Sequence, residues 1–190
     1  RLEEIYRRYL DRRKFEKAQL ERILFVLDGA GIVPLILKGA RYLVEPVASW
    51  CEARSIADFD LLVRPSDAER AVAVLKAEGY RQGAIYVPNY HHLPVLECPG
   101  EPAALEIHTA ALSFAGQRIM NTEHVWAHAT KAAGGSFFVM PIRWHALLGL
   151  LHHQISDRGH IRRMLAVKAL WEWTMLAREF SDEDWDAIAA

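Results

Sequence analysis

The sequence predicts an α+β fold, in which a half that mixes strands and helices is followed by a helical half. Short apolar runs alternate with helix-type periodicity over about residues 22–113. From about residue 120 to residue 190, apolar residues recur at helical steps of three and four. We therefore expect an N-terminal helix over 1–28, an α/β core over 29–116 and a helical region over 117–190.

Composition narrows the classes of function. The chain has 190 residues, of which 52% are hydrophobic and 25% charged, as in globular proteins with a sizeable core. A net charge of −1 argues against binding of long nucleic acid. No apolar run reaches about 18 residues, so no membrane span is expected. The charged N-terminus does not resemble a signal peptide, and Cys51 and Cys98 are expected as free thiols in the cytoplasm.

The expected elements follow from periodicity and from the residues that interrupt it. The first helix ends at Gly29 and Gly31, and its basic cluster Arg7, Arg8, Arg12 and Arg13 either faces solvent or holds an anionic partner. Ser66 and Glu69 have the spacing of a capping box that opens a helix. The remaining expected elements are strands at 32–37, 54–63, 104–109 and 136–140, a hairpin over 82–88 and 92–98, and helices over 40–44, 125–133, 141–156, 160–178 and from 181.

The strand that ends at Val63 carries two carboxylates on one face. Side chains two apart on a strand share a face, so Asp58 and Asp60 lie together, opposite Phe59 and Leu61. Two like charges at this spacing repel, and a divalent ion such as Mg²⁺ or Mn²⁺ is the usual compensation in enzymes. A lone Asp-x-Asp triplet also occurs at strand ends that cap helices or bind loop amides, and this alternative stays open.

Two other segments supply polar groups suited to the same site. Lys38 and Gly39 follow an apolar strand and precede a helix, an arrangement that suits phosphate. Glu106 and His108 share one face of the strand over 104–109. The adjacent pair His152 and His153, together with Asp157, faintly suggests a metal-hydrolase pattern. Neighbouring residues on an α-helix point about 100° apart, however, so the two histidines should not bind one ion.

The order of these motifs resembles the uncharacterised nucleotidyltransferase family of the polymerase-β-like superfamily, over roughly residues 20–175. The motifs that carry the resemblance are Lys38-Gly39, Arg54-x-x-x-Asp58-x-Asp60-Leu-Leu-Val, Glu-Gly-Tyr80, His91-His92, Glu106-Ile-His108 and His152-His153. The resemblance implies a small mixed β-sheet flanked by helices, with a helical domain behind it. It also implies metal-dependent transfer of a nucleoside monophosphate from an NTP to a hydroxyl group.

The resemblance assigns roles to particular residues. Asp58, Asp60 and Glu106 match the catalytic carboxylates that hold two divalent ions, Mg²⁺ or Mn²⁺. Lys38 and Gly39 stand where most of the superfamily has Gly-Ser, so phosphate binding falls to backbone amides and to Lys38, aided by Arg54. The histidines are candidates for contact with the acceptor or for orienting Glu106; they are His91, His92 and His108.

The sequence therefore predicts a metal-dependent nucleotidyltransferase whose partners are a nucleotide and an unidentified hydroxyl acceptor. The acceptor is a small molecule, a peptide or protein, or RNA. Two alternatives remain: a catalytically silent nucleotide- or partner-binding domain of the same fold, and a toxin-like enzyme that modifies transfer RNA. The exchange of Gly-Ser for Lys38-Gly39 favours the silent domain, whereas three convergent acids favour the enzyme.

Overall fold

A computed structural model describes residues 2–54, 56–83 and 91–189, and confirms the predicted α+β class. The chain forms two compact units. The first comprises Arg1–Thr109 and Lys131–Phe138, and the second comprises Ala110–Thr130 and Val139–Ala190. Within the described ranges, no helix is both long enough and apolar enough to cross a membrane.

The sheet is mixed, and its two longest strands lie at its centre. Its strand order is β3-β4-β5-β2-β1-β7-β6. β2 and β5 are parallel, whereas β1 with β2, and β4 with both β3 and β5, are antiparallel. The strand bounds are β1 Leu35–Ile36, β2 Asp58–Leu62, β3 Arg81–Gln82, β4 Leu96–Glu97, β5 Ala104–His108, β6 Thr130–Lys131 and β7 Phe138–Val139.

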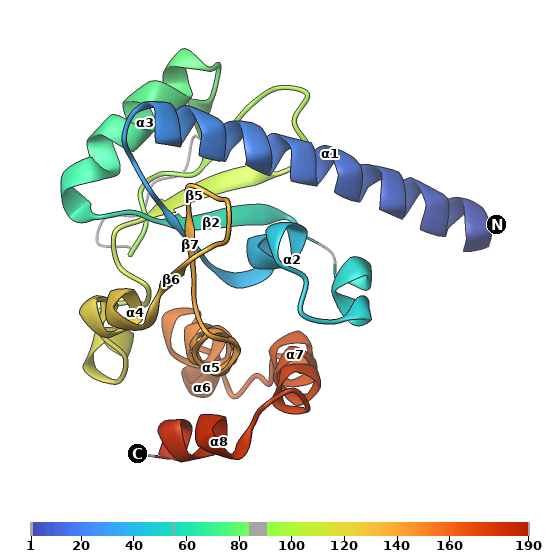
Figure 1. Ribbon diagram of the computed structural model, residues 1–190, viewed down its shortest axis with the longest axis vertical. Coiled ribbons are helices and arrows are strands. Elements are labelled where there is room, and N and C mark those ends of the chain that lie inside the picture. The colour runs from blue at the N-terminus through green and yellow to red at the C-terminus, as the bar shows by residue number, and fades with distance from the viewer. Residues whose placement is uncertain (1, 55, 84–90, 190) are drawn as a thin grey trace. The chain divides into compact units, whose positions relative to one another are not determined.

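Two helices of the first unit, α1 (Leu2–Gly29) and α3 (Ala68–Ala77), cover one face of β2 and β5 (Figure 1). The core under these helices is apolar and includes Phe59 and Leu61 of β2, as the alternation predicts. At about 25 cal/mol per Å² of buried apolar surface, packing of this kind is the main source of stability. Because one face of each strand is occupied by this core, Asp60, Glu106 and His108 lie on the other face.

A buried amide joins α1 to the segment that leads into β5. Gln19 is fully buried, and its Nε2 donates to the carbonyl oxygen of Ala103 at 2.8 Å and to Tyr80 Oη at 3.1 Å. Its Oε1 accepts from the backbone N–H of Ala103 at 3.1 Å. These bonds satisfy a polar group that would otherwise be costly to bury, and they fix the start of β5 against the helix.

One expectation for the first unit needs revision, and another can be compared only in part. The capping box at Ser66 and Glu69 is wrong: a 3₁₀ turn over Pro65–Asp67 leads into α3, and no side-chain hydrogen bond caps the helix at Asp67. Only the ends of the expected hairpin can be compared, as the pair β3 and β4, because residues 84–90 lie outside the described residues. The Lys38-Gly39 turn is 3₁₀, and α2 (Arg41–Val44) follows it as expected.

The second unit is helical, but its helices break at unexpected places. The helix expected over 125–133 is α4 (Thr122–His128), capped by Asn121. The helix expected over 160–178 is two helices, because Arg163 takes left-handed backbone angles at the end of the first of them. The described helices of this unit are α4, α5 (Ile142–Leu151), α6 (Gly159–Arg162), α7 (Val167–Ala177) and α8 (Asp182–Ala189), with a π-helical turn over His152–Ser156.

Candidate active site

The register of two parallel strands brings the polar residues together. Asp60 on β2 pairs with Glu106 on β5, and the next residue on the same face of β5 is His108. Both strands bury their other face against α1 and α3, so a slip of one residue would turn the carboxylates into the core. The hydrophobic pattern of the two strands therefore fixes the position of these side chains.

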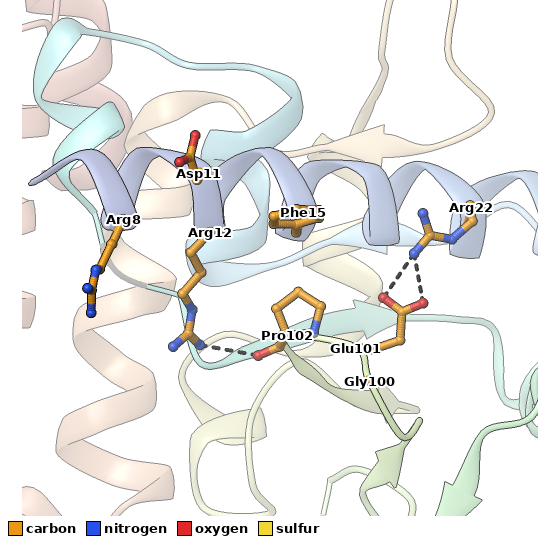
Figure 2. A pocket seen from close by; sticks show the side chains of 8 residues that line it. All are labelled: Arg8, Asp11, Arg12, Phe15, Arg22, Gly100, Glu101 and Pro102. Atoms are coloured by element: carbon orange, nitrogen blue, oxygen red, sulfur yellow. Dashed lines mark hydrogen bonds and ion pairs between the residues drawn. The ribbon is translucent and has the colours of Figure 1, made fainter. Parts of the chain in front are cut away.

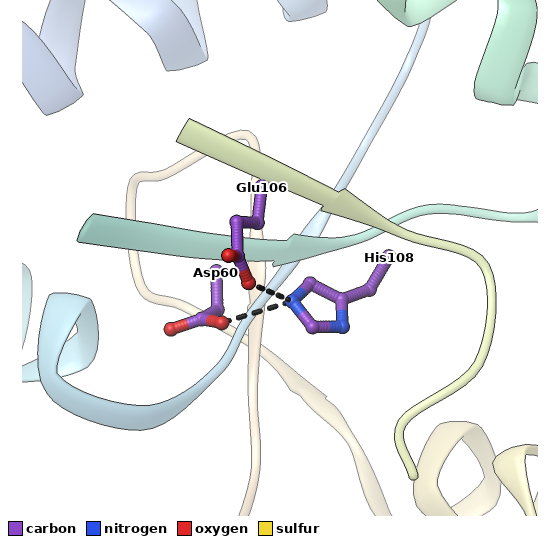
Figure 3. A group of neighbouring side chains, drawn as sticks. All are labelled: Asp60, Glu106 and His108. Atoms are coloured by element: carbon purple, nitrogen blue, oxygen red, sulfur yellow. Dashed lines mark hydrogen bonds and ion pairs between the residues drawn. The ribbon is translucent and has the colours of Figure 1, made fainter. Parts of the chain in front are cut away.

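The imidazole of His108 contacts both carboxylates through one nitrogen (Figure 3). Its Nε2 lies 2.9 Å from Asp60 Oδ1 and 3.3 Å from Glu106 Oε2. Asp60 is 1% exposed and His108 is fully buried, so little water screens these charges. The Nδ1 atom of His108 has no hydrogen-bond partner among the described residues.

Lys38 also reaches into this group. Its Nζ lies 2.6 Å from Asp60 Oδ1, the oxygen that faces His108. The backbone of Lys38 has a φ of +47°, which costs about 1–2 kcal/mol for a residue other than glycine. Gly39 lies close to Arg54, because a Cβ added at Gly39 would lie 3.0 Å from the guanidinium of Arg54. The loop thus brings Lys38, Gly39 and Arg54 together.

The charges shift the ionisation of the buried groups. Burial alone would raise the pKa of Asp60, but the charge of Lys38 and the hydrogen bond from His108 hold that pKa far below its usual range. The pKa of Glu106 is lowered, against its own burial, by the hydrogen bond from His108. Burial would lower the pKa of His108, yet its bonds to Asp60 and Glu106 raise it. The pKa of Lys38 is likewise raised by Asp60, in spite of burial.

The structure groups the predicted site residues differently from the sequence. Among the described residues, the acidic and histidine ligand atoms that all lie within 4.8 Å of one another belong to Asp60, Glu106 and His108. Asp58 is half-buried at the start of β2, on the same face as Asp60, but it lies outside this three-residue group. The group supplies two carboxylate oxygens and one imidazole nitrogen, a donor set that fits a divalent ion.

The other two histidines lie beside the group. His92 bridges His108 in antiparallel fashion, and its Nε2 is 4.0 Å from Glu106 Oε2. The rings of His91 and His92 lie 5.1 and 5.2 Å from the ring of His108. His91 is buried. The sequence reasoning placed these histidines near the site but missed the contact between His108 and Asp60, because the register of β2 and β5 is not legible in the sequence.

A hollow elsewhere in the first unit has a different character. It has a volume of about 550 Å³ and lies between α1 and the turn at Gly100–Pro102. Figure 2 shows protein partners for two of its arginines: Arg22 binds Glu101 at 2.7 and 2.9 Å, and Arg12 binds the Pro102 carbonyl at 3.2 Å. Arg13 binds the Arg54 carbonyl at 2.8 Å. These arginines fasten α1 to the unit.

The comparisons agree with this geometry. The model of a family described as uncharacterised nucleotidyltransferase matches residues 1–190. The chain belongs to this family. The solved structure of the antibiotic-resistance factor ANT(2'')-Ia is similar, with a TM-score of 0.60 and 12% identity, over 90% of this chain and 87% of that one. At this identity the likeness shows the fold alone. None of the curated proteins matches this chain.

The predicted family, fold class and enzyme class are therefore confirmed. The chain is a nucleotidyltransferase, a transferase whose family uses a nucleotide substrate. The carboxylates Asp60 and Glu106 lie on neighbouring parallel strands of the sheet. The contact of Lys38 with Asp60 was not predicted, since it depends on the left-handed backbone at Lys38, which no residue type nearby signals.

Proposed function

We propose that this nucleotidyltransferase moves a nucleoside monophosphate from an NTP to the hydroxyl group of a small molecule, with divalent metal held by Asp60, Glu106 and Asp58. The observation that supports the proposal most strongly is the buried group on β2 and β5, in which two carboxylates face one imidazole and one lysine. Buried charges of this kind are costly to keep, and they cluster at functional sites. A divalent ion bound there would stabilise the attacking and leaving oxygens of an in-line displacement.

The residues around the group suit the charge changes of this reaction. The acceptor oxygen forms a bond to the α-phosphorus, the bond from that phosphorus to the bridging oxygen breaks, and pyrophosphate leaves. Arg54 and Lys38 flank Gly39, where their positive charges suit the departing pyrophosphate. Lys38 holds Asp60 Oδ1 when no nucleotide is present, and its long side chain transfers to a phosphate oxygen when the triphosphate binds.

Glu106 stays ionised during this chemistry. Its lowered pKa makes it a poor base, which suits a carboxylate that binds metal better than one that takes the proton of the acceptor. We assign that proton to water at the mouth of the site. His92, with its Nε2 4.0 Å from Glu106, is placed to orient the carboxylate or the acceptor.

A small-molecule acceptor fits the charge of the chain and its structural neighbour. A net charge of −1 gives no strong attraction to a polynucleotide. The neighbour ANT(2'')-Ia is named as an antibiotic-resistance factor, and its fold spans nearly the same length. Both points favour a compact acceptor over transfer RNA or a protein.

The test is transfer itself. The protein is incubated with each NTP labelled on the α-phosphate, with Mg²⁺ or Mn²⁺, and with pooled hydroxyl-bearing small molecules including aminoglycosides and other sugars. Mass spectrometry then seeks an acceptor that has gained a nucleoside monophosphate, and a coupled assay follows pyrophosphate. We expect a product that is absent with Asp60→Asn. Binding of an NTP without any transfer would support the silent domain. Labelling of transfer RNA or protein in parallel reactions would show that the acceptor is that macromolecule and not a small molecule.

A further inference from the structure

The group on β2 and β5 contains an imidazole nitrogen where the family resemblance implies only carboxylates as metal ligands. His108 Nε2 approaches oxygens that come from two different strands, Asp60 Oδ1 at 2.9 Å and Glu106 Oε2 at 3.3 Å. Figure 3 shows the imidazole pointing its Nε2 between the two carboxylates. A histidine that merely orients one carboxylate would contact that carboxylate alone, from the side away from the ion.

These separations are those of neighbouring ligands around one ion. Metal–nitrogen and metal–oxygen bonds are roughly 2.0–2.2 Å long, so neighbouring ligand atoms at octahedral or tetrahedral angles lie about 2.8–3.6 Å apart. The two distances from Nε2 fall within this range. All three ligand atoms also lie within 4.8 Å of one another. An ion that contacts both oxygens on this side therefore also meets Nε2.

The same test separates His108 from its neighbour. The Nε2 of His92 is 4.0 Å from Glu106 Oε2, and its Nδ1 lies 2.8 Å from the carbonyl oxygen of Leu93. His92 is therefore a matched control: a histidine beside the same carboxylate, outside the three-ligand group.

We propose that His108 is a direct nitrogen ligand of the metal ion, and that this ligand makes the site favour first-row transition-metal ions such as Mn²⁺ over Mg²⁺. The inference rests on the proposed function and deepens it by naming the class of metal. Mg²⁺ demands oxygen ligands and keeps its waters, whereas transition-metal ions accept imidazole. On binding, Nε2 loses its proton to solvent, and its lone pair forms the bond to the ion.

The experiment uses Mn²⁺ alone as the probe, since its electron spin reports nitrogen ligands directly. Free Mn²⁺ is titrated by electron paramagnetic resonance, with Mg²⁺ as competitor, and the bound ion is examined by electron spin echo envelope modulation. The native chain is prepared with natural and with ¹⁵N-labelled histidine. His108→Gln, His92→Gln and Asp60→Asn are measured beside it. The ¹⁵N comparison needs no substitution, so a lack of histidine coupling in the native chain would reject His108 as a ligand even if His108→Gln folds poorly.

We expect histidine nitrogen coupling in the native chain and in His92→Gln, and its loss in His108→Gln. His108→Gln should bind Mn²⁺ at least about tenfold more weakly, since even an indirect partner of a metal ligand is worth 10–100-fold. The affinity of His108→Gln for Mg²⁺ should change less than its affinity for Mn²⁺. The ratio of the two affinities should therefore be smaller in the variant than in the native chain.

Two results would overturn the inference. Mn²⁺ that binds in an Asp60-dependent way but without histidine coupling would reject His108 as a ligand and leave the proposed nucleotidyl transfer standing. Coupling that disappears in His92→Gln while Mn²⁺ remains bound would assign the nitrogen to the neighbour. If Mn²⁺ fails to bind even with an NTP, the metal-dependent function and this inference fall together.

Discussion

Two regions of the molecule combine histidines with an acidic residue, and they differ in burial and convergence. On β2 and β5, the carboxylate of Asp60 is 2% exposed and His108 is fully buried. In the turn after α5, the Nδ1 atoms of His152 and His153 lie 3.6 and 3.4 Å from Asp157 Oδ2, but the side chain of Asp157 is 50% exposed. In the first region, the ligand atoms of Asp60, Glu106 and His108 all lie within 4.8 Å of one another.

The difference shows that proximity in sequence is a poor guide to a site. The sequence argument against His152 and His153 assumed an α-helix, in which adjacent side chains point about 100° apart. The turn over His152–Ser156 is π-helical and brings both Nδ1 atoms near one carboxylate, yet among the described residues these side chains do not form a three-ligand metal group. Two properties set apart the strand group, which is Asp60, Glu106 and His108 on β2 and β5. Burial strengthens the electrostatic interactions among these side chains. The two paired strands hold the side chains rigidly.

The largest expected effect comes from matched Asp→Asn substitutions in the two regions. Asp60→Asn removes a buried charge that balances Lys38 and His108, so we expect transfer to fall by at least about 10³-fold, or several kcal/mol of lost stabilisation. Asp157→Asn should leave transfer unchanged. Steady-state rates with a fixed acceptor measure both, with circular dichroism to confirm folding. Near-normal turnover in Asp60→Asn would remove the assigned role of the strand group.

Lys38→Met is expected to have the next largest effect, and in two directions. Loss of the cation should weaken NTP binding by roughly 10–100-fold, the value of one hydrogen bond to a charged group. The same change frees Asp60 Oδ1, so Mn²⁺ should bind more tightly when no nucleotide is present. Isothermal titration calorimetry measures both affinities, with the exposed Lys76→Met as a control of equal charge. Equal NTP affinity in both variants would rule out a phosphate contact by Lys38.

The contributions of His108 in the first unit and His124 in the second unit to the free energy of unfolding should change with pH in opposite directions. The raised pKa of His108 means that its stabilisation is complete below its ordinary pKa of 6.5 and is lost as pH rises. His124 on α4 has a pKa lowered by burial and by His128, so its contribution grows as pH rises. Urea unfolding of the native chain should show a free energy of unfolding that declines between pH 6 and 9. The decline should be shallower in His108→Gln and steeper in His124→Gln. The reverse pattern would contradict the assigned charges.

Asp60 gives the complementary change in acid. Its pKa is held far below the ordinary 3.8, so its stabilisation is present above that value and is lost as pH falls further. In the native chain, protonation of Asp60 should therefore reduce the free energy of unfolding as pH falls below about 4. Asparagine cannot be protonated there, so this part of the reduction should be absent in Asp60→Asn. A native and a variant chain that unfold in parallel over this range would show that Asp60 is not ionised in the folded state.

The smallest expected effect is that of Asp157→Asn on stability. Its ion pairs with the two histidines are partly exposed, and exposed pairs contribute about 0–1 kcal/mol. We expect a change of less than about 1 kcal/mol in the free energy of unfolding. A larger loss of unfolding free energy in urea would show that the turn over His152–Ser156 is a rigid element. The two regions would then differ less than we infer.

The sequence predicted the parts of this site that depend on local periodicity. Alternation along each strand placed Asp60 opposite the core, and it placed Glu106 and His108 on one face, as observed. The register of two strands that lie far apart in sequence was not accessible, so the contact of His108 with Asp60 was missed. The break between α6 and α7 was missed too, because arginine gives no signal of a left-handed backbone at Arg163.

The most direct test of the central claim is calorimetric titration of the native chain with each NTP, with and without Mn²⁺, repeated with Asp60→Asn and Asp157→Asn. The account predicts metal-dependent binding of at least one NTP that survives Asp157→Asn and is lost with Asp60→Asn. Binding that is equal in all three proteins, or that needs no metal, would contradict the claim that the strand group is the nucleotide site.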